Sequence, residues 1–177
     1  MVPGCVALPR AAGFTKGRTP SVVDATAGLG REAYLLASLG AEVTLIERSP
    51  KIYALLQDGL ARAGVAGGEA AATVARMTLL FGDAKALLPE LAPEIVLVDP
   101  MHPPRGNTAL VRKEMRLLRA IVGSDPDAAD LMRVALAAAT KRVVLKYPLR
   151  AEGMAGLAPP SHQIRGKTTR YDVYMTG

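Results

Sequence analysis

The sequence predicts an α/β fold, in which a mostly parallel sheet is covered by helices on both faces. Short apolar segments alternate with amphipathic segments along most of the 177 residues, and this alternation is typical of strands joined by helices. Half of the residues are hydrophobic, which suits strands buried on both faces. Glycine-rich or acidic turns follow the expected strands, and the loops after parallel strands meet at one edge of a sheet.

The first expected unit is a strand, a turn and a helix. Residues 21–25, S-V-V-D-A, form a short apolar run that ends in small residues. A glycine-rich turn follows at 26–30, and apolar residues then recur at helical spacing over 31–39, with Gly40 as the stop. The preceding residues 1–20 are rich in glycine, proline and basic residues, so we expect a leader or the remnant of an amino-terminal extension.

The same alternation continues through the expected domain, residues 21–177. Further strands are expected at 42–46, 77–81, 95–98 and 142–146, and helices at 50–62, 85–88, 108–122 and 127–139. Asp125 or Asp127 would cap the last of these helices. The segments 162–165 and 171–175 alternate in polarity around G-K-T-T, which predicts a closing antiparallel hairpin.

Composition excludes several classes of protein. The single cysteine, Cys5, allows no disulfide within the chain and favours a reducing compartment. One cysteine and the separated His102 and His162 form no metal-binding pattern, so no metal is expected. The chain has no apolar run long enough to span a membrane, and residues 1–10 do not resemble a signal peptide. We therefore expect a cytoplasmic protein.

The net charge of +6 favours a polyanionic partner such as nucleic acid, although a basic surface without such a partner would give the same value. Basic side chains crowd the segment after residue 104 and the end of the strand at 142–146. These side chains are candidates for gripping phosphates, and Tyr147 is a candidate for lining a base pocket. A solvated helix face is the competing interpretation. The candidate RNA contacts are Arg105, Arg112, Lys113, Arg116, Lys146 and Tyr147.

The turn D-A-T-A-G-L-G-R-E is a candidate cofactor site. Gly28 and Gly30 permit backbone conformations closed to other residues, and with Ala33 they match the dinucleotide pattern G-x-G-x-x-A. The helix that begins near Arg31 offers free N–H groups to a polar ligand. A tight turn without any ligand would show the same pattern. The candidate cofactor residues of this turn are Asp24, Ala27, Gly28 and Gly30.

Two further carboxylates are expected at the same edge. Glu47 ends the second strand, where a carboxylate can accept both hydroxyls of a ribose, although a solvated surface glutamate is the alternative. Asp83 ends the third strand and could accept from an adenine amino group, with Ala84 supplying a backbone contact. Asp83 could also cap the next helix, and both roles are compatible. Together these features suit an adenosine ligand without a large negative charge.

The segment V-L-V-D-P-M-H-P-P, residues 96–104, carries the candidate chemistry. The lone pair of a nucleobase amine is delocalised, and the carboxylate of Asp99 can accept its hydrogens and orient it toward a methyl donor. Pro100 stiffens the loop, and His102 could stack on the base. A proline-rich loop with an ordinary histidine is the alternative. Cys5 lies in no such loop, which argues against carbon-5 methylation of a pyrimidine.

Several motifs together carry a resemblance to a known family. The segments V-V-D-A-T-A-G-L-G-R-E, L-I-E-R-S-P, V-L-V-D-P-M-H-P, A-L-V-R-K-E-M-R, A-T-K-R-V-V-L-K and T-R-Y-D-V-Y occur in the order found in the ribosomal RNA small subunit methyltransferase J family. The similarity covers roughly residues 11–177. It implies methylation of guanine N2 in 16S rRNA, with S-adenosylmethionine as the cofactor and 16S rRNA or the small ribosomal subunit as the partner.

The resemblance also implies a class I methyltransferase fold, with a seven-stranded sheet and a carboxyl-terminal antiparallel hairpin. The cofactor contacts that it implies are Arg31, Glu32, Glu47, Arg48, Asp83, Ala84 and Asp99. This sequence departs from the family at two points. Family members usually carry a sizeable extension before the glycine motif, and His102 stands where an aromatic residue is usual. A histidine could stack less strongly than such a residue.

Two other functions compete with this interpretation. A nicotinamide-dependent oxidoreductase is compatible with the glycine turn and Glu47, but it leaves the segment around Asp99 unexplained, and the chain shows no catalytic His, Tyr-Lys or Cys arrangement. A non-catalytic RNA-binding module with a methyltransferase fold is compatible with the basic charge. The intact Asp99-Pro100 pair and cofactor loops argue against such a module. Neither alternative fixes the oligomeric state.

Overall fold

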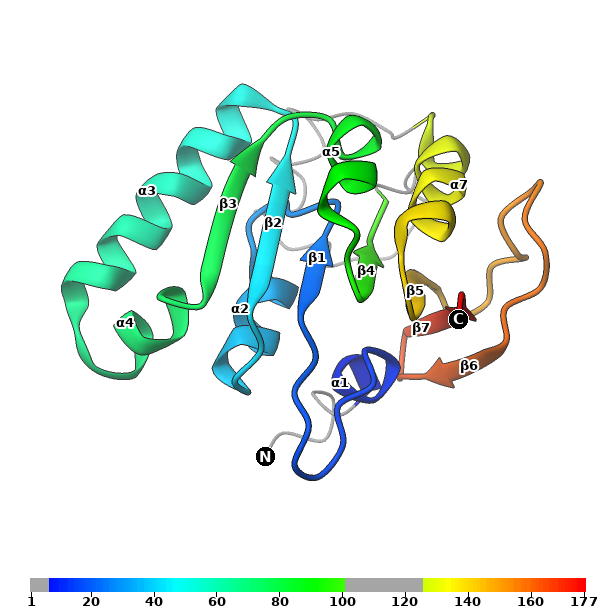
Figure 1. Ribbon diagram of the computed structural model, residues 1–177, viewed down its shortest axis with the longest axis horizontal. Helices are drawn as coiled ribbons and strands as arrows, with labels where there is room; N and C mark the ends of the chain where they lie inside the picture. Colours follow the sequence, from blue (N-terminus) through cyan, green and yellow to red (C-terminus); the bar gives the residue numbers. More distant parts are fainter. Residues whose placement is uncertain (1–6, 101–125) are drawn as a thin grey trace.

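The computed structural model describes residues 7–100 and 126–177. This part of the chain forms a seven-stranded sheet in the order β3-β2-β1-β4-β5-β7-β6 (Figure 1). The strands are β1 Val22–Asp24, β2 Val43–Glu47, β3 Met77–Phe81, β4 Ile95–Val98, β5 Arg142–Pro148, β6 His162–Arg165 and β7 Thr169–Met175. Strands β1 to β5 are parallel, and β7 pairs antiparallel with both β5 and β6. The predicted parallel sheet with a closing hairpin is confirmed.

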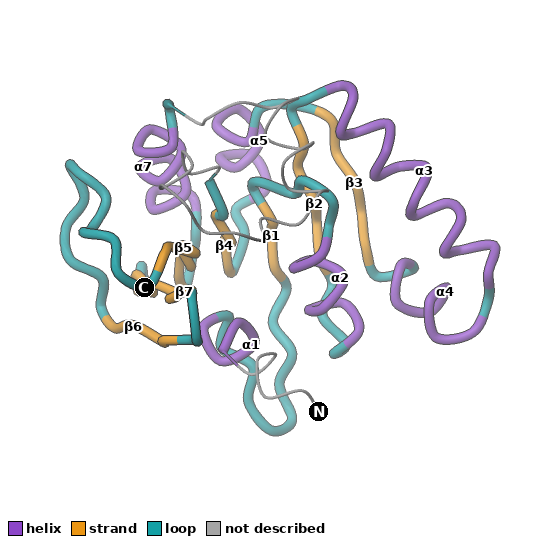
Figure 2. Tube along the Cα trace, turned by 180° about the vertical axis from the view of Figure 1, so that it is seen from behind, coloured by secondary structure: helices purple, strands orange, loops and turns teal. Residues whose placement is uncertain are grey.

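Helices cover both faces of this sheet (Figures 1 and 2). Their bounds are α1 Ala7–Ala11, α2 Arg31–Ser38, α3 Pro50–Ala66, α4 Gly68–Val74, α5 Ala84–Leu91 and α7 Ala128–Ala138. One core cluster joins the sheet to side chains of α1, α2 and α3, and a second joins the opposite face to α5 and α7. The helix expected at 108–122 lies outside the described residues.

Successive residues of the central strands enter opposite cores. Val22 of β1 packs in the cluster with α2, whereas Val23 packs in the cluster with α5 and α7. In β4 the same alternation places Ile95 and Leu97 on one face, and Val96 and Val98 on the other. Each such buried side chain stabilises the fold by about 1.5–3 kcal/mol. Burial on both faces explains why these strands read as continuous apolar runs.

The amino-terminal segment differs from the expectation of a separate leader. Leu8, Ala11 and Ala12 are almost fully buried and belong to the same core cluster as β1 and α2. Helix α1 contacts β6 and β7, which places it beside the carboxyl-terminal hairpin. Residues 7–12 therefore pack against the same core as β1 and α2. Their short apolar run, A-L-P-R-A-A, is the signal that the sequence offered.

Helix α3 runs beyond the stop expected at Gly64. The helix also contains Gly59 in its interior. A side chain there would meet no atom within 4 Å, so this glycine lies on an open face and costs only about 1 kcal/mol relative to alanine. The helix ends instead at Gly67, whose φ of 75° is accessible mainly to glycine. The short helix α4 follows directly, and the sequence analysis missed it because its run of small residues shows no strong periodicity.

A buried ion pair fixes the hairpin to the end of β5. Arg170 is 6% exposed and Asp172 is 1% exposed, and Nε of Arg170 donates to both carboxylate oxygens of Asp172 at 2.9 and 3.1 Å. The guanidinium also donates to backbone carbonyls of residues 148, 149 and 151 and lies 5.3 Å from the ring centre of Tyr147. One side chain thus orders the loop that follows β5.

Replacing Asp172 with alanine should lower the free energy of unfolding by about 3–5 kcal/mol, because it leaves the Arg170 charge buried without its counter-ion. Chemical denaturation followed by circular dichroism measures the loss. The double variant Arg170→Met with Asp172→Leu removes both charges and should regain much of the stability. If Asp172→Ala is as stable as the wild type, the ion pair contributes nothing to the stability of the fold.

Candidate functional site

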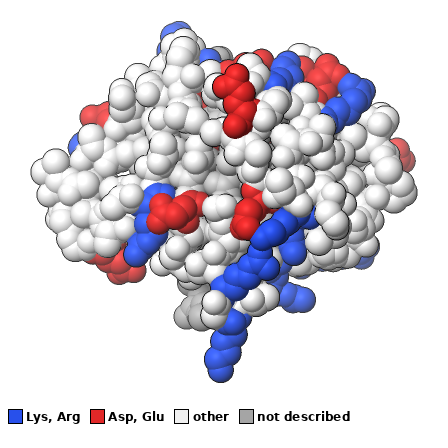
Figure 3. Space-filling view, in the orientation of Figure 1, with Lys and Arg blue, Asp and Glu red and all other residues white. Residues whose placement is uncertain are grey.

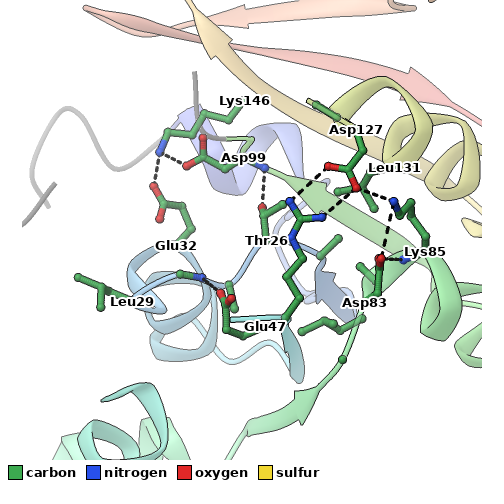
Figure 4. Close-up of a pocket in the computed structure, with 18 of the residues that line it drawn as sticks. Thr26, Leu29, Glu32, Glu47, Asp83, Lys85, Asp99, Asp127, Leu131 and Lys146 are labelled. Carbon is green, nitrogen blue, oxygen red and sulfur yellow. Dashed lines mark hydrogen bonds and ion pairs between the residues drawn. The ribbon is translucent and has the colours of Figure 1, made fainter. Parts of the chain in front are cut away.

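A cavity of about 520 Å³ opens where the carboxyl ends of the central strands meet (Figure 4). Its walls come from the loops that follow β1, β2, β3 and β4, from the start of α2 and α7, and from the end of β5. The sequence predicted this convergence because four functional turns follow four parallel strands. The structure places the glycine turn, Glu47, Asp83 and Asp99 around this one cavity.

The glycine turn after β1 is shaped by its neighbours. Gly28 and Gly30 have φ values of 53° and 72°, which other residues rarely adopt. A Cβ atom on Gly30 would lie 2.9 Å from Cδ1 of Leu56, so the turn packs directly against α3. Gly30 precedes the first residue of α2, Arg31, which lines the cavity. The turn therefore presents both its backbone and a helix amino terminus to a ligand.

Glu47 is buried at 7% exposure rather than solvated. Its Oε2 accepts from the backbone N–H of Gly28 at 3.0 Å, and its Oε1 accepts from the N–H of Ser49 at 2.7 Å. Burial raises the pKa of this carboxyl, while these backbone hydrogen bonds favour its ionised form. Glu47 thus ties the end of β2 to the glycine turn as well as lining the cavity.

Asp83 stands at the N-cap of α5, where its Oδ1 accepts from the N–H of Lys85 at 2.9 Å. It also lines the cavity together with Gly82 and Ala84. The N–H of Gly82 donates to the carbonyl of Glu47 at 3.1 Å, so the turns after β2 and β3 are held side by side. The structure therefore allows the cap and the ligand contact to coexist at Asp83.

Asp24 ends β1 just behind the cavity and is 2% exposed. Its Oδ1 accepts from the N–H of Thr26 at 3.1 Å. Burial raises the pKa of Asp24 to about 7, and the nearby charges of Glu32 and Asp99 act in the same direction. Lys146 partly opposes them. Asp24 is thus a buried carboxyl that titrates near neutral pH.

Replacing Asp24 with asparagine should change how stability depends on pH. Because the folded pKa lies above the ordinary 3.8, the wild type has its full stability from this group below pH 4 and loses it as pH rises through 7. The loss attributable to Asp24 is about 4 kcal/mol at most. The free energy of unfolding, measured with denaturant, should decrease more between pH 5 and pH 8 for the wild type than for the variant. Equal decreases would contradict the assignment.

A lysine and two carboxylates meet at the other end of the cavity. Nζ of Lys146 lies 2.6 Å from Oδ2 of Asp99 and 2.5 Å from Oε1 of Glu32, and all three side chains are 23–31% exposed. The N–H of Asp99 donates to Oγ1 of Thr26 at 2.7 Å. Burial lowers the pKa of Lys146, but the charges of Asp99 and Glu32 outweigh it and raise this pKa above its ordinary value.

A second cluster forms around Asp127, which Lys85 links to Asp83. Asp127 stands at the N-cap of α7, yet its side chain makes no cap hydrogen bond there. It accepts instead from Arg48 at 2.8 and 3.2 Å and from Nζ of Lys85 at 2.5 Å. These two partners hold the pKa of Asp127 well below its usual range. Sequence reasoning proposed a cap and missed this bridge between β2, α5 and α7, because the pairing joins residues far apart in the chain.

The charge of the cavity is nearly balanced. Its lining carries Arg31, Arg48, Lys85 and Lys146 as basic residues, and Glu32, Glu47, Asp83, Asp99 and Asp127 as acidic residues. On the face shown in Figure 3, the largest group of adjoining Lys and Arg side chains lies toward the lower edge, away from the carboxyl ends of β2 and β3. A cavity whose lining charges nearly balance suits a ligand that carries no run of phosphates.

Comparison with known proteins decides the family. The family described as "Putative SAM-dependent methyltransferase" matches residues 5–176. The ribosomal RNA small subunit methyltransferase J of Agrobacterium fabrum is 71% identical over 96% of this chain and 81% of its own length. Its counterpart in Brucella anthropi is 69% identical over 96% of this chain and 82% of its own length. The chain belongs to the ribosomal RNA small subunit methyltransferase J family.

Solved structures agree with this membership. A SAM-dependent methyltransferase from Neisseria gonorrhoeae superposes with a TM-score of 0.78 at 39% identity, over 97% of this chain and 71% of that protein. An RNA methyltransferase from Salinibacter ruber, solved with S-adenosylhomocysteine, gives a TM-score of 0.62 at 15% identity, over 99% of this chain and 93% of that protein, and shows the fold alone. The chain has the class I methyltransferase fold and is an S-adenosylmethionine-dependent methyltransferase.

The cavity of this methyltransferase fits its cofactor. The buried Glu47 and the cap residue Asp83 offer carboxylate oxygens on neighbouring loops, and the glycine turn leaves room for a close backbone approach. The near balance of charge matches a ligand that carries both signs of charge and no phosphate. Among residues 7–100 and 126–177, no three metal-ligating side chains form a group. No helix in the same ranges has the length and apolarity needed to cross a membrane.

The remaining candidates fall into three groups. Ala27 and Glu32 line the cavity as expected, and Pro100 is buried directly after Asp99. The prediction that Lys146 grips RNA phosphates is not supported, because its ammonium is held by two carboxylates inside the cavity. Tyr147 packs under the guanidinium of Arg170. The candidates His102, Arg105, Arg112, Lys113 and Arg116 lie outside the described residues.

Proposed function

We propose that this chain methylates the exocyclic N2 of a guanosine in 16S rRNA, in the cytoplasm, with the rRNA or the small ribosomal subunit as its partner. The observation that carries the proposal is the position of Asp99, which follows β4 and faces the same cavity as the glycine turn, Glu47 and Asp83. The names of the relatives that are 69–71% identical supply the class of RNA. The positive net charge fits a polyanionic substrate.

In this proposal the turns after β1, β2 and β3 hold the cofactor. Glu47 accepts the ribose hydroxyls, Asp83 accepts from the adenine amino group, and Ala84 adds a backbone contact. Ala27 and Gly28 line the floor, Asp24 and Gly30 support this turn from beside the cavity, and Arg31, Glu32 and Arg48 complete the walls. When bound, S-adenosylmethionine supplies an electrophilic methyl group. The enzyme then contributes mainly proximity and alignment.

Asp99 is the proposed catalytic residue. Its carboxylate accepts a hydrogen from the target amine and turns the nitrogen lone pair toward the cavity. The nitrogen forms a bond to the methyl carbon as the carbon–sulfur bond breaks and S-adenosylhomocysteine leaves. The methylated nitrogen is then cationic and loses one proton to Asp99 or to water. Pro100 follows Asp99 directly, is buried, and would fix the direction of the loop. His102 is the proposed stacking partner of the base.

The RNA contacts remain proposals from the sequence. Arg105, Arg112, Lys113 and Arg116 follow Asp99 within one segment, so they would bring phosphates close to the cavity mouth. Tyr147 follows the cavity residue Lys146 near the end of β5 and would line the base pocket. These side chains would position the substrate, while Asp99 orients the reacting amine.

Methyl transfer to small ribosomal subunits that lack the modification tests the proposal directly. Purified protein and labelled S-adenosylmethionine should yield N2-methylguanosine, read by mass spectrometry of the nucleosides. Protein-free 16S rRNA in a parallel reaction shows whether the assembled subunit is required. RNA binding without any labelled nucleoside, in a protein shown by calorimetry to bind cofactor, would favour a non-catalytic RNA-binding module instead.

A further inference from the structure

The ammonium of Lys146 lies among several acidic side chains. It lies at the end of β5, and its ammonium contacts Asp99 from the loop after β4 and Glu32 from the first turn of α2 (Figure 4). The buried carboxyl of Asp24 at the end of β1 also lies within electrostatic range of this ammonium. Two carboxylates from two elements therefore hold one lysine, and a third carboxyl lies within electrostatic range of it.

We propose that Lys146 is a positioning residue for the methyl transfer, which holds the Asp99 carboxylate ionised and oriented while anchored by Glu32. The proposal rests on the proposed function, since it assigns to Asp99 the acceptance of the amine hydrogen. Nothing in it requires Lys146 to contact the cofactor, the base or a phosphate.

The surrounding structure gives Lys146 the rigidity that such a role needs. The neighbouring Leu145 is fully buried and pairs with Val98 of β4, while Lys146 itself pairs with Tyr171 of β7. The lysine stem therefore leaves a strand that is held on both sides. The backbone of Asp99 is fixed by Thr26, and the lysine ammonium adds a contact to its Oδ2. Both ends of the ion pair are thus held by the sheet.

The exposure and partners of Lys146 distinguish it from a phosphate contact. Its side chain is 23% exposed, and two carboxylates already hold the ammonium, so a phosphate would have to displace them. Glu32 lies in the first turn of α2, just after the glycine turn that the proposed function assigns to the cofactor, and Asp99 lies on the loop that it assigns to the amine. Lys146 therefore joins the start of α2 to the loop after β4.

Two variants and a matched control test this role. Lys146→Met removes the charge and keeps an apolar stem, Lys146→Arg keeps the charge, and Lys141→Met removes an ion-paired lysine just before the same strand, bonded to Glu94 rather than to a cavity residue. Lys146→Met should lower kcat at pH 7 at least tenfold with KM for RNA unchanged within twofold. Lys146→Arg should restore most of kcat, and Lys141→Met should leave it unchanged.

The pH profile separates positioning from a merely structural role. Without the ammonium, Asp99, Glu32 and Asp24 repel one another more strongly, so the acid limb of kcat should move to higher pH by one unit or more in Lys146→Met. A rise in KM for RNA with kcat intact would overturn the proposal in favour of a phosphate contact. A loss of kcat that is equal at every pH, without rescue by arginine, would overturn it in favour of a structural role.

A measurement without cofactor or RNA keeps this test independent of the proposed function. Carbon-13 spectra of the side-chain carboxyls, with the Asp99 signal assigned from Asp99→Asn, follow the titration of Asp99, whose Oδ2 lies 2.6 Å from Nζ of Lys146. The Asp99 midpoint should rise in Lys146→Met and stay unchanged in Lys141→Met. An unchanged midpoint in Lys146→Met overturns the proposal even if the wild type methylates RNA. If the midpoint rises in Lys146→Met but the wild type is inactive on RNA, only the proposed function is refuted.

Discussion

Replacing Asp99 with alanine should lower kcat by about 10²–10⁴-fold, the range typical of a positioned acid or base. The affinity for RNA should stay within about threefold. Asp99 follows β4 at the cavity, with its N–H bonded to Thr26 and its carboxylate to Lys146. Alanine keeps the backbone hydrogen bond and removes only the carboxylate, so RNA binding should survive while orientation of the amine is lost. Single-turnover kinetics with saturating cofactor and RNA measures the change.

Asp99→Asn is the control for the shape of this side chain. Its amide oxygen can still accept a hydrogen from the amine, but the group cannot take up a proton, so kcat should lie between those of alanine and the wild type. Lys146 retains Glu32 as a partner in both variants, which limits any loss of folding stability. Near-normal kcat in Asp99→Ala would contradict the mechanism. A loss confined to KM would instead place Asp99 in substrate binding.

The fold could be predicted from the sequence because its signals are local. The strand bounds Met77–Phe81, Ile95–Val98 and His162–Arg165 match the expected ranges exactly at both ends, since each is a short run flanked by turn residues. The errors occurred where local preference was overruled by packing. Gly64 is a normal helix stop, yet α3 continues through it to Ala66.

The positions of the cavity carboxylates were also predictable, since they follow from strand ends. Their partners were not, because ion pairs depend on distances between residues far apart in the chain. Asp127 pairs with Arg48 across 79 positions, and Lys146 pairs with Glu32 across 114. A sequence shows that Lys146 is basic but not that two carboxylates hold its charge, so it became a candidate RNA contact where the structure shows an ion pair inside the cavity.

Glu47 has a second role that the sequence did not reveal. The sequence predicts that it contacts a ribose, and the structure adds that its two oxygens accept from the N–H groups of Gly28 and Ser49. A carboxylate fixed from two sides is held without rotational freedom, which lowers the entropic cost of binding a ligand. The same contacts mean that a variant at Glu47 will change both the fold of the turn and the affinity for cofactor.

Glu47→Ala should weaken cofactor binding about 10- to 100-fold, the effect expected when hydrogen bonds to a charged group are lost. It should also lower the free energy of unfolding by about 1–3 kcal/mol, because the N–H groups of Gly28 and Ser49 lose their acceptor. Calorimetric titration with S-adenosylmethionine measures the first effect, and denaturant unfolding measures the second.

Ser49→Ala separates these two effects. Ser49 caps α3 by accepting from the N–H of Ile52, while its own N–H donates to Glu47. Alanine removes the cap, at a cost of about 1 kcal/mol, and keeps the contact with Glu47. Ser49→Ala should therefore lose stability and retain its affinity for cofactor. If Glu47→Ala behaves in the same way, with affinity intact, Glu47 serves the turn alone and another group must bind the ribose.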